Sequence, residues 1–433
     1  MRVVLQAFGS LGDLHPTMAI ALALKARSHD VTIVTHEQYR LKVRRERLGF
    51  EPTPPDFGGE KGDVEELYRK TMDGAHGSEF VVRELCLPHV RGQYDALLRA
   101  AQGADAIVAH PLGYAAPLVA EKLGIPWVST ALQPLIQWSA TDPSVYPNAP
   151  WATPILRLSP VFGRWFVALG RAQTRPWMAP VDRLRADLGL PPAREHPMFE
   201  GMVSPRLHLC LFSRVLAEPQ PDWPASSVQT GFAFYDRGDD GAMMPPGLTE
   251  FLDQGPPPVV FTLGSSAVMV AGGFYRTAAE VAKTLGRRAV LLVGPDPRNA
   301  LADLPEGVAA FPYAAYSELF PRAAAIVHQG GAGTTAQALR AGKPMLVVPF
   351  AHDQPDHAER ITRRGLGLRL ARGSFSPGRV LPLLERLLGD PGIAARAAAA
   401  GSEVRSENGA VAAAQAIEAA AEMELAAAPR RGV

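Results

Sequence analysis

The stretch Ala325-Ile-Val-His-Gln-Gly-Gly-Ala-Gly-Thr-Thr-Ala-Gln-Ala-Leu-Arg-Ala-Gly342 decides the fold of this chain. Residues 325–327 offer no polar face and predict a buried strand. Glycines and threonines follow, and a helical pattern then continues to Gly342, a residue type that commonly follows a helix end. A strand, a glycine turn and a helix N-terminus direct free backbone N–H groups and a positive dipole end at one point. The stretch predicts a phosphate-binding turn or a tight turn without a ligand, and no Gly-Lys-Ser/Thr follows to make it a P-loop.

The composition indicates a soluble protein of two domains. The chain has 433 residues, more than one ordinary hydrophobic core holds, and 47% of them are hydrophobic. The net charge of +1 gives no basis for binding nucleic acid or an anionic membrane through bulk charge. Cys86 and Cys210 are the only cysteines and lack ligand spacing, which argues against disulfides and zinc. No apolar run reaches the roughly 18–20 residues of a membrane span, and Met1 leads into a strand without a signal peptide. We therefore expect a cytoplasmic protein with no stable membrane anchor.

The N-terminal half has the pattern of a parallel, doubly wound sheet. Residues 3–7 predict a strand, residues 8–16 a turn, residues 17–27 a helix and residues 31–35 the next strand. This is a right-handed β-α-β unit. Further apolar runs, with helical segments between them, continue the alternation at 106–109, 127–131 and 207–212.

A second domain of the same kind follows a linker. Residues 219–257 are rich in proline, glycine and aspartate, and beyond them the alternation of strands and helices resumes. The predicted domains are 1–218, the linker region 219–257, a second sheet domain 258–395 and a helical tail 396–433.

An aromatic region interrupts the first domain. Residues 133–180 contain four of the six tryptophans, and Phe162, Trp165, Phe166 and Leu169 keep helical spacing. Such a stripe is either core or the apolar wall of a ligand pocket.

The carboxyl ends of two such sheets should form a cleft that binds a ligand. Besides the glycine turn, the segment 264–266 (Gly264, Ser265, Ser266) follows a predicted strand and offers hydroxyl and N–H groups. Residues 349–356 follow another strand and include Asp353 and Gln354, groups that can hydrogen-bond sugar hydroxyls. The alternative for Asp353 is to cap the helix that follows it.

Asp13 is the candidate general base from the first domain. It follows the first strand, and a carboxylate at a cleft can accept a proton from an acceptor hydroxyl. Its alternative role is also helix capping. His15 and His110 are possible partners that tune or relay the proton, although a histidine at a strand end is more often structural.

These motifs resemble a known family. The segment 328–335, followed by Gly342-Lys-Pro344 and Asp353-Gln354, is similar to the donor-binding signature of the UDP-glycosyltransferase superfamily, which has the GT-B fold. Residues 9–16 match its pattern Gly-Ser-x-Gly-Asp-x-x-Pro. The likeness includes the antibiotic-maturation and sterol glycosyltransferases, and the rhamnosyltransferase of rhamnolipid synthesis. It implies two Rossmann-like domains facing across a cleft, with the C-terminal helix packing back on the N-terminal domain.

The resemblance also implies a nucleotide-sugar site. Tyr313 would stack on the base, the Ala314 backbone would contact the base edge, and Gln337 would reach the ribose. Either His328 or Gln329 would contact the diphosphate. The full set of implied donor-site residues is Ser10, Gly12, Gly264, Ser265, Ser266, Tyr313, Ala314, His328, Gln329, Gly330, Gly331, Ala332, Gly333, Thr334, Thr335, Gln337, Asp353 and Gln354.

The implied reaction is an inverting transfer of a hexose from a UDP- or dTDP-sugar, with Asp13 as the base and no metal or other cofactor. Trp138, Trp165 and Phe166 would form the wall for a hydrophobic or phenolic small-molecule acceptor. A nucleotide-sugar epimerase on the same fold is the alternative. An oxidoreductase is disfavoured because the Gly-x-Gly-x-x-Gly spacing is absent.

Overall fold

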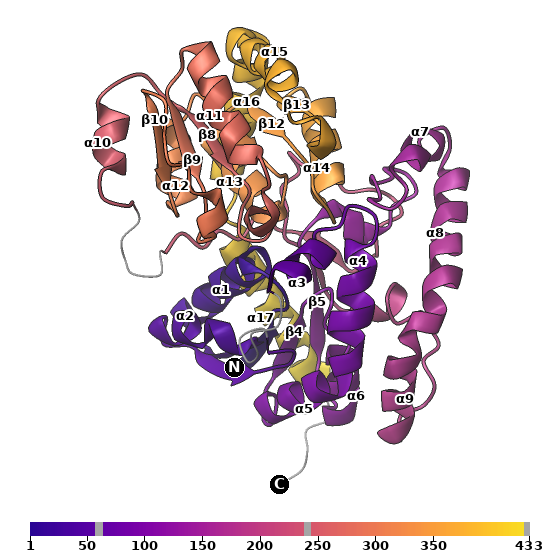
Figure 1. Ribbon diagram of the computed structural model, residues 1–433. Coiled ribbons are helices and arrows are strands. Elements are labelled where there is room, and N and C mark those ends of the chain that lie inside the picture. The colour runs from indigo at the N-terminus through magenta and orange to yellow at the C-terminus, as the bar shows by residue number, and fades with distance from the viewer. Residues whose placement is uncertain (57–63, 238–243, 428–433) are drawn as a thin grey trace.

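The protein has two parallel-sheet domains in the computed structural model, which describes residues 1–56, 64–237 and 244–427. The first sheet has seven strands in the order β3-β2-β1-β4-β5-β6-β7, and the second has six in the order β10-β9-β8-β11-β12-β13. All paired strands run parallel, and helices cover the sheets (Figure 1). This confirms the predicted doubly wound architecture of two Rossmann-like domains.

The strands are short, and the central ones are apolar, as strands buried on both faces should be. Those of the first sheet are β1 (Arg2–Gln6), β2 (Asp30–Thr35), β3 (Gly49–Pro52), β4 (Ala106–Ala109), β5 (Trp127–Ala131), β6 (His208–Cys210) and β7 (Ser227–Gln229). Those of the second are β8 (Val259–Thr262), β9 (Ala289–Leu292), β10 (Val308–Phe311), β11 (Ala325–His328), β12 (Met345–Val347) and β13 (Gly367–Arg369).

The helices of the first domain are α1 (Leu11–Ala26), α2 (Arg40–Arg45), α3 (Val64–Thr71), α4 (Gly77–Phe80), α5 (Val90–Ala100), α6 (Ala116–Leu123), α7 (Thr153–Leu156), α8 (Pro160–Thr174) and α9 (Ala179–Asp187). Those that follow are α10 (Leu248–Asp253), α11 (Phe274–Leu285), α12 (Tyr316–Leu319), α13 (Ala332–Ala341), α14 (Gln354–Arg363), α15 (Pro377–Gly389), α16 (Pro391–Ser406) and α17 (Gly409–Ala427). None of the helices in the described ranges is long and apolar enough to cross a membrane.

Each sheet reverses its strand order at one place. The reversal lies between β1 and β4 in the first sheet and between β8 and β11 in the second. Ligands bind to doubly wound sheets at the carboxyl ends of the strands that flank this switch point. The loops that follow these four strands therefore define where a site should be.

The first helix begins earlier than predicted. The expected turn at 8–16 is mostly helical, because α1 starts at Leu11. Ser10 and Asp13 form a capping box: the Ser10 hydroxyl accepts from the Gly12 N–H (3.2 Å) and Asp13 Oδ2 accepts from the Ser10 N–H (2.8 Å). Asp13 is thus held on a helix and not in a loop.

The domain limits differ from the predicted ones at two places. Strand β7 lies inside the predicted linker but completes the first sheet. Helix α16 packs on α13 of the second domain, and the chain crosses back only at residues 407–408, beyond the predicted limit of 395. Helix α17 then packs on α1 (Figure 1), with Ile417 in the same buried cluster as Leu14, as the family resemblance implied.

The aromatic stripe of the first domain is split between two faces. Phe166 on α8 contacts Tyr146 (ring centroids 4.9 Å apart), whereas Trp165 is 73% exposed. A helical period assigns residues to a common face only within about a quarter turn, and Trp165 and Phe166 are 100° apart. The stripe therefore does not form one wall, and Trp165 lies outside it.

Candidate active site

The two switch points meet across the domain boundary. A Cβ atom built on Gly333, in the first turn of α13, would lie 3.8 Å from the Cα atom of Gly12 in α1. The N-terminal ends of two helices, one from each domain, thus come together. Each presents backbone N–H groups that have no partner within the helix.

Asp13 lies beside this contact and is held on both oxygens. Its Oδ2 accepts from the N–H (2.8 Å) and the hydroxyl (3.2 Å) of Ser10, and its Oδ1 lies 3.2 Å from His110 Nε2. The His110 Nδ1 accepts from the Leu112 N–H (3.1 Å), so a neutral ring carries its proton on Nε2 and donates it to Asp13. The Asp13 side chain remains 30% exposed. Capping α1 therefore leaves part of the Asp13 carboxylate accessible.

His36 and Tyr39 support the loop before α1, and neither was predicted from the sequence pattern. Gly9 has φ +114°, and a side chain there would meet Asp13 Oδ2 at 2.5 Å. The Gly9 N–H donates to His36 Nε2 (3.2 Å), and the Tyr39 hydroxyl donates to the Gly9 carbonyl (3.0 Å). Burial lowers the pKa of His36 to about 4, so this ring stays neutral and accepts. The available signal was a histidine directly after a buried strand, as at His110.

His15 does not join this group. Its ring packs against Tyr235, with centroids 5.1 Å apart. Of the two proposed partners, the structure brings only His110 to Asp13.

The glycine turn between β11 and α13 forms the opposite side of the site. Gly331 is the N-cap residue of α13 and supplies no side-chain cap, so the first N–H groups of the helix are open to an anion. Gly330 has φ +92°, and a Cβ there would meet Val347 Cγ1 at 2.7 Å. The helix also begins with Thr334 and Thr335 in its first turn, as predicted.

His328 and Gln329 point in different directions. His328 is fully buried, its Nδ1 accepts from the Gly330 N–H (3.0 Å), and burial lowers its pKa to about 3. The amide of Gln329 lies between the two glycine loops. Its Nε2 is 3.4 Å from Thr334 Oγ1 and 2.4 Å from the position of a Cβ on Gly264. Gln329 therefore faces the space between the glycine turn and the loop 264–266, which we call the cradle. His328 is buried and supports the turn through its bond with the Gly330 N–H.

The segment after β8 completes the cradle. Gly264 has φ +65° and its N–H donates to Thr262 Oγ1 (3.3 Å), which is 2.8 Å from the Tyr316 hydroxyl. Ser265 is exposed and Ser266 is half-buried. Gly264 is thus the residue of this loop that lies beside the amide of Gln329.

Asp353 is not used as a helix cap. It occupies the N-cap position of α14 but makes no side-chain capping bond. Its Oδ2 lies 3.3 Å from His357 Nδ1, and burial raises its pKa. Gln354 accepts from the N–H groups of Phe350 (2.8 Å) and Ala351 (3.2 Å), which fixes its carbonyl and leaves the NH2 as the donor. A carboxyl group and an amide donor are suited to bind hydroxyl groups.

The region in which the resemblance places the nucleotide is more exposed than the glycine turn. Tyr313 is 53% exposed in the loop after β10, while Ala314 is fully buried and offers only its backbone. Gln337 donates to Asp236 Oδ1 (2.9 Å) and accepts from Arg340 (2.7 Å), so its amide is engaged on both sides. Asp236, from the linker region, brings a carboxylate to the position where the resemblance implied a ribose contact.

The aromatic residues form a cluster beside the cleft. Trp138 stacks on Tyr146 (centroids 5.8 Å apart, 9° between planes) and contacts Phe199 (4.6 Å), and Phe166 closes the cluster. Tyr146 and Phe199 were not predicted, because nothing in their local sequence marks them.

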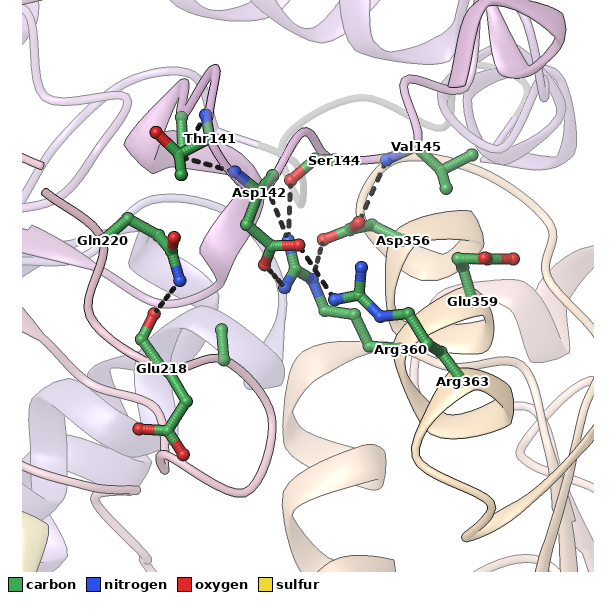
Figure 2. Close-up of polar contacts among 12 residues, drawn as sticks. Thr141, Asp142, Ser144, Val145, Glu218, Gln220, Asp356, Glu359, Arg360 and Arg363 are labelled. Atoms are coloured by element: carbon green, nitrogen blue, oxygen red, sulfur yellow. Dashed lines mark hydrogen bonds and ion pairs between the residues drawn. The ribbon is translucent and has the colours of Figure 1, made fainter. Parts of the chain in front are cut away.

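The loop that carries Tyr146 is tied to α14. Figure 2 shows Arg360 between Asp356 and Asp142, with Arg360 Nε 2.8 Å from Asp356 Oδ2. The Val145 N–H donates to Asp356 Oδ1 (3.0 Å). Since α14 begins with Asp353 and Gln354, the same helix positions the predicted sugar ligands and the aromatic loop.

Comparisons with known proteins agree with this geometry. Residues 3–138 match the glycosyltransferase family 28 N-terminal domain, and residues 278–422 match the erythromycin biosynthesis protein CIII-like C-terminal domain. The chain is 33% identical to O-mycaminosyltylonolide 6-deoxyallosyltransferase of Streptomyces fradiae, over 94% of this chain and 95% of the relative. It is 31% identical to glycosyltransferase GtfE of Amycolatopsis orientalis, over 85% of each chain.

Solved structures show the same fold. The glycotransferase of kitacinnamycin superposes with a TM-score of 0.72 at 21% identity, over 97% of this chain and 98% of that chain. Glycosyltransferase VinC in complex with dTDP gives a TM-score of 0.69 at 21% identity, over 98% and 100%. None of these relatives supports the epimerase alternative. The chain therefore belongs to the UDP-glycosyltransferase superfamily and is a nucleotide-sugar-dependent glycosyltransferase with the GT-B fold.

Proposed function

We propose that this enzyme transfers a hexose from a dTDP- or UDP-sugar to a hydroxyl group of a hydrophobic small molecule, with inversion at the anomeric carbon. One observation supports this above all. A carboxylate with an exposed edge, Asp13, lies beside the point where α1 meets the N-terminal end of α13. A base and an anion-binding helix end are the two groups that an in-line displacement needs.

In the proposed step Asp13 accepts the proton of the acceptor hydroxyl. The acceptor oxygen forms a bond to the anomeric carbon while the bond from that carbon to the diphosphate oxygen breaks. The departing diphosphate takes the electron pair and is stabilised by the N–H groups that begin α13 and by Thr334. His110 donates to the second oxygen of Asp13 and so keeps the basic oxygen directed at the cleft. No metal or other cofactor is invoked.

Geometry and relatives support different parts of the donor proposal. The half-exposed ring of Tyr313 is available to stack on a base, and Asp353 and Gln354 are available to the sugar hydroxyls. The rhamnosyltransferase SpnG and glycosyltransferase VinC were solved with thymidine diphosphate, and the S. fradiae relative is named as a deoxyhexose transferase. We therefore propose dTDP-sugars first and UDP-sugars second.

The acceptor proposal depends on the aromatic cluster. Trp138 and Phe166 are partly exposed and pack on the buried Tyr146, and the exposed parts of such aromatic rings can bind rings and hydrocarbon groups. Trp165 is not part of this wall. Both cysteines are free and buried, which accords with the reducing cytoplasm in which we place the reaction.

The test is to incubate the enzyme with α-linked dTDP- and UDP-hexoses and a panel of apolar alcohols and phenols. We expect a β-linked product, identified by the anomeric coupling constant in its NMR spectrum. An α-linked product would exclude the single displacement, and sugar interconversion without transfer would exclude the transferase step.

A further inference from the structure

Helices α7 and α8 carry an exposed apolar face. The described part of the chain has twelve exposed large hydrophobic side chains, and seven of them lie between residues 151 and 169. These seven residues are Trp151, Ile155, Leu158, Val161, Phe162, Trp165 and Leu169, and we refer to them as the apolar face. Folded proteins rarely leave such a cluster of apolar side chains in water without a binding function.

The apolar face is held rigidly on the molecule. Phe162, Trp165 and Leu169 have the spacing of one helical stripe on α8, and all three side chains are exposed. The adjoining side of α8 is packed: Phe166 contacts Tyr146, and a Cβ on Gly163 would lie 2.7 Å from the Ala140 Cα. In Figure 1, α8 forms the right-hand edge of the molecule, with no element outside it. The stripe is thus a convex ridge and not the wall of a pocket.

Arginines outnumber carboxylates in the segment that carries this ridge, and two of them have no ion-pair partner in the described chain. Residues 143–185 contain six arginines and one carboxylate, a net charge of +5, whereas the whole chain has +1, so the remaining residues sum to −4. Arg164 and Arg183 are exposed and have no ion-pair partner among the described residues. The other four arginines pair with carboxylates, in the pairs Arg157–Glu359, Arg171–Glu200, Arg175–Asp182 and Arg185–Glu121. The positive charge left near the ridge is therefore that of Arg164 on α8 and Arg183 on α9.

We propose that the apolar face binds the surface of an anionic lipid bilayer. The helix would lie in the interface, with Trp165 and Leu169 inserted at the boundary of headgroups and acyl chains and Arg164 beside the lipid phosphates. A helix with Trp, Phe and Leu on one face, arginines beside them and no carboxylate on it is suited to this position. A convex ridge favours a bilayer over a protein partner, since a protein would need a matching groove. This contact is peripheral and reversible, and it is not a membrane span.

The proposed contact places the aromatic cluster near the lipid. Phe166 lies on the same helix and contacts Tyr146 on its inner side. If the proposed function is correct, an apolar acceptor dissolved in the bilayer reaches the cleft along α8. The binding itself does not depend on the transfer reaction and is tested without donor or acceptor.

The experiment is co-sedimentation of the full chain with vesicles of phosphatidylcholine and of phosphatidylcholine mixed with phosphatidylglycerol. We expect binding to the mixed vesicles that weakens as salt increases. The double substitution Trp165→Ser, Leu169→Ser should lower the partition coefficient roughly tenfold or more. Leu41→Ser is the matched control, since Leu41 is 72% exposed on α2 and should leave binding unchanged. Arg164→Glu should reduce binding to the mixed vesicles only.

Circular dichroism and thermal midpoints establish that the variants are folded. If the double variant does not fold, the wild-type and Arg164→Glu measurements still decide the question. Failure of the wild-type chain to bind the mixed vesicles overturns the proposal. A dimer in sedimentation velocity that the double variant dissociates, without vesicle binding, assigns the ridge to a second copy and also overturns it.

Discussion

The Nε2 atom of His110 lies 3.2 Å from Oδ1 of Asp13, although 97 residues separate them. Strands β1 and β4 are neighbours in the sheet, so the residues that follow them meet at one edge. The histidine donates to the carboxylate oxygen that Ser10 does not use, and together they fix its orientation. The capping box of a helix thereby also serves as the support for a proposed catalytic base.

Asp13→Asn should separate catalysis from structure. The amide oxygen can still accept from the Ser10 N–H and keep the helix start, while the amide NH2 faces the Nε2–H of His110, so the thermal midpoint should fall slightly. The amide cannot accept the acceptor proton, and we expect kcat to fall about 10²- to 10⁴-fold. Initial rates and dTDP titrations measure the two effects. Turnover within a few-fold of the wild type would move the base elsewhere, whereas weakened dTDP binding would indicate a structural role.

Local pattern was sufficient to predict the central strands and the glycine turn, but not β3, β7, β10 and β13, whose sequences are short or polar. An apolar run followed by glycines carries this information within a few residues, and parallel strands bring their ends together. Asp13, Gln329 and Asp353 were found in this way. The choice between His328 and Gln329 was not, because successive residues at a strand end point to opposite sides.

Contacts between distant segments were beyond sequence reasoning. Nothing local to His36 or Asp236 indicates that one supports Gly9 and the other binds Gln337, since 27 and 101 residues separate the partners. The spacing on α8 showed which residues share a side of the helix. It did not show which other segments pack against that side of the helix, and the side chain of Trp165 is 73% exposed in the described chain.

Gln329 and His328 should respond differently to substitution. Gln329→Ala removes an amide from the cradle, and we expect dTDP affinity to fall about fivefold, the value of one hydrogen bond, with an unchanged thermal midpoint. His328→Ala removes a buried acceptor of the Gly330 N–H and should destabilise the fold by about 2 kcal/mol. Calorimetric titration and thermal melts distinguish the two. The opposite assignment of effects would show that His328 contacts the diphosphate.

Tyr313→Ala should weaken nucleotide binding while Tyr313→Phe retains it. The ring is 53% exposed, so its removal costs the fold little, but stacking on a base is worth about 1–3 kcal/mol. We expect the Kd of dTDP to increase about tenfold or more in the alanine variant. The phenylalanine variant is the control for the hydroxyl group. Equal affinity of all three proteins would place the base elsewhere.

Acidification should destabilise the protein through His36. Its folded pKa of about 4 lies below the ordinary value of 6.5, so the unfolded chain gains the proton first as the pH falls. The stability that the neutral ring contributes is complete above pH 6.5 and is lost as the pH falls toward 4. This amounts to about 2 kcal/mol between pH 7 and pH 5.

Thermal melts of His36→Gln across this range should therefore show a smaller decline than the wild type, from a lower starting midpoint. Exposed His76 provides the control, and His76→Gln should leave the decline unchanged. A decline in His36→Gln equal to that of the wild type would assign the acid sensitivity to other buried groups.

Arg360 should couple the acceptor side of the cleft to the donor side. It is 2% exposed and binds Asp356 on its own helix and Asp142 on the aromatic loop (Figure 2). Arg360→Met leaves the buried Asp356 without its ion-pair partner and Asp142 with Arg363 alone, and a broken buried pair costs about 3–5 kcal/mol. We expect a marked decrease in the thermal midpoint, and in the folded variant a larger loss in kcat/KM for the acceptor than in dTDP affinity.

Arg363→Met is the matched control, because Arg363 binds the other oxygen of Asp142 (2.9 Å) but is 39% exposed, where a pair contributes about 0–1 kcal/mol. Equal effects of the two substitutions would mean that the buried ion pairs of Arg360 do not fix the loop. The contact between α14 and the aromatic cluster would then depend on packing alone.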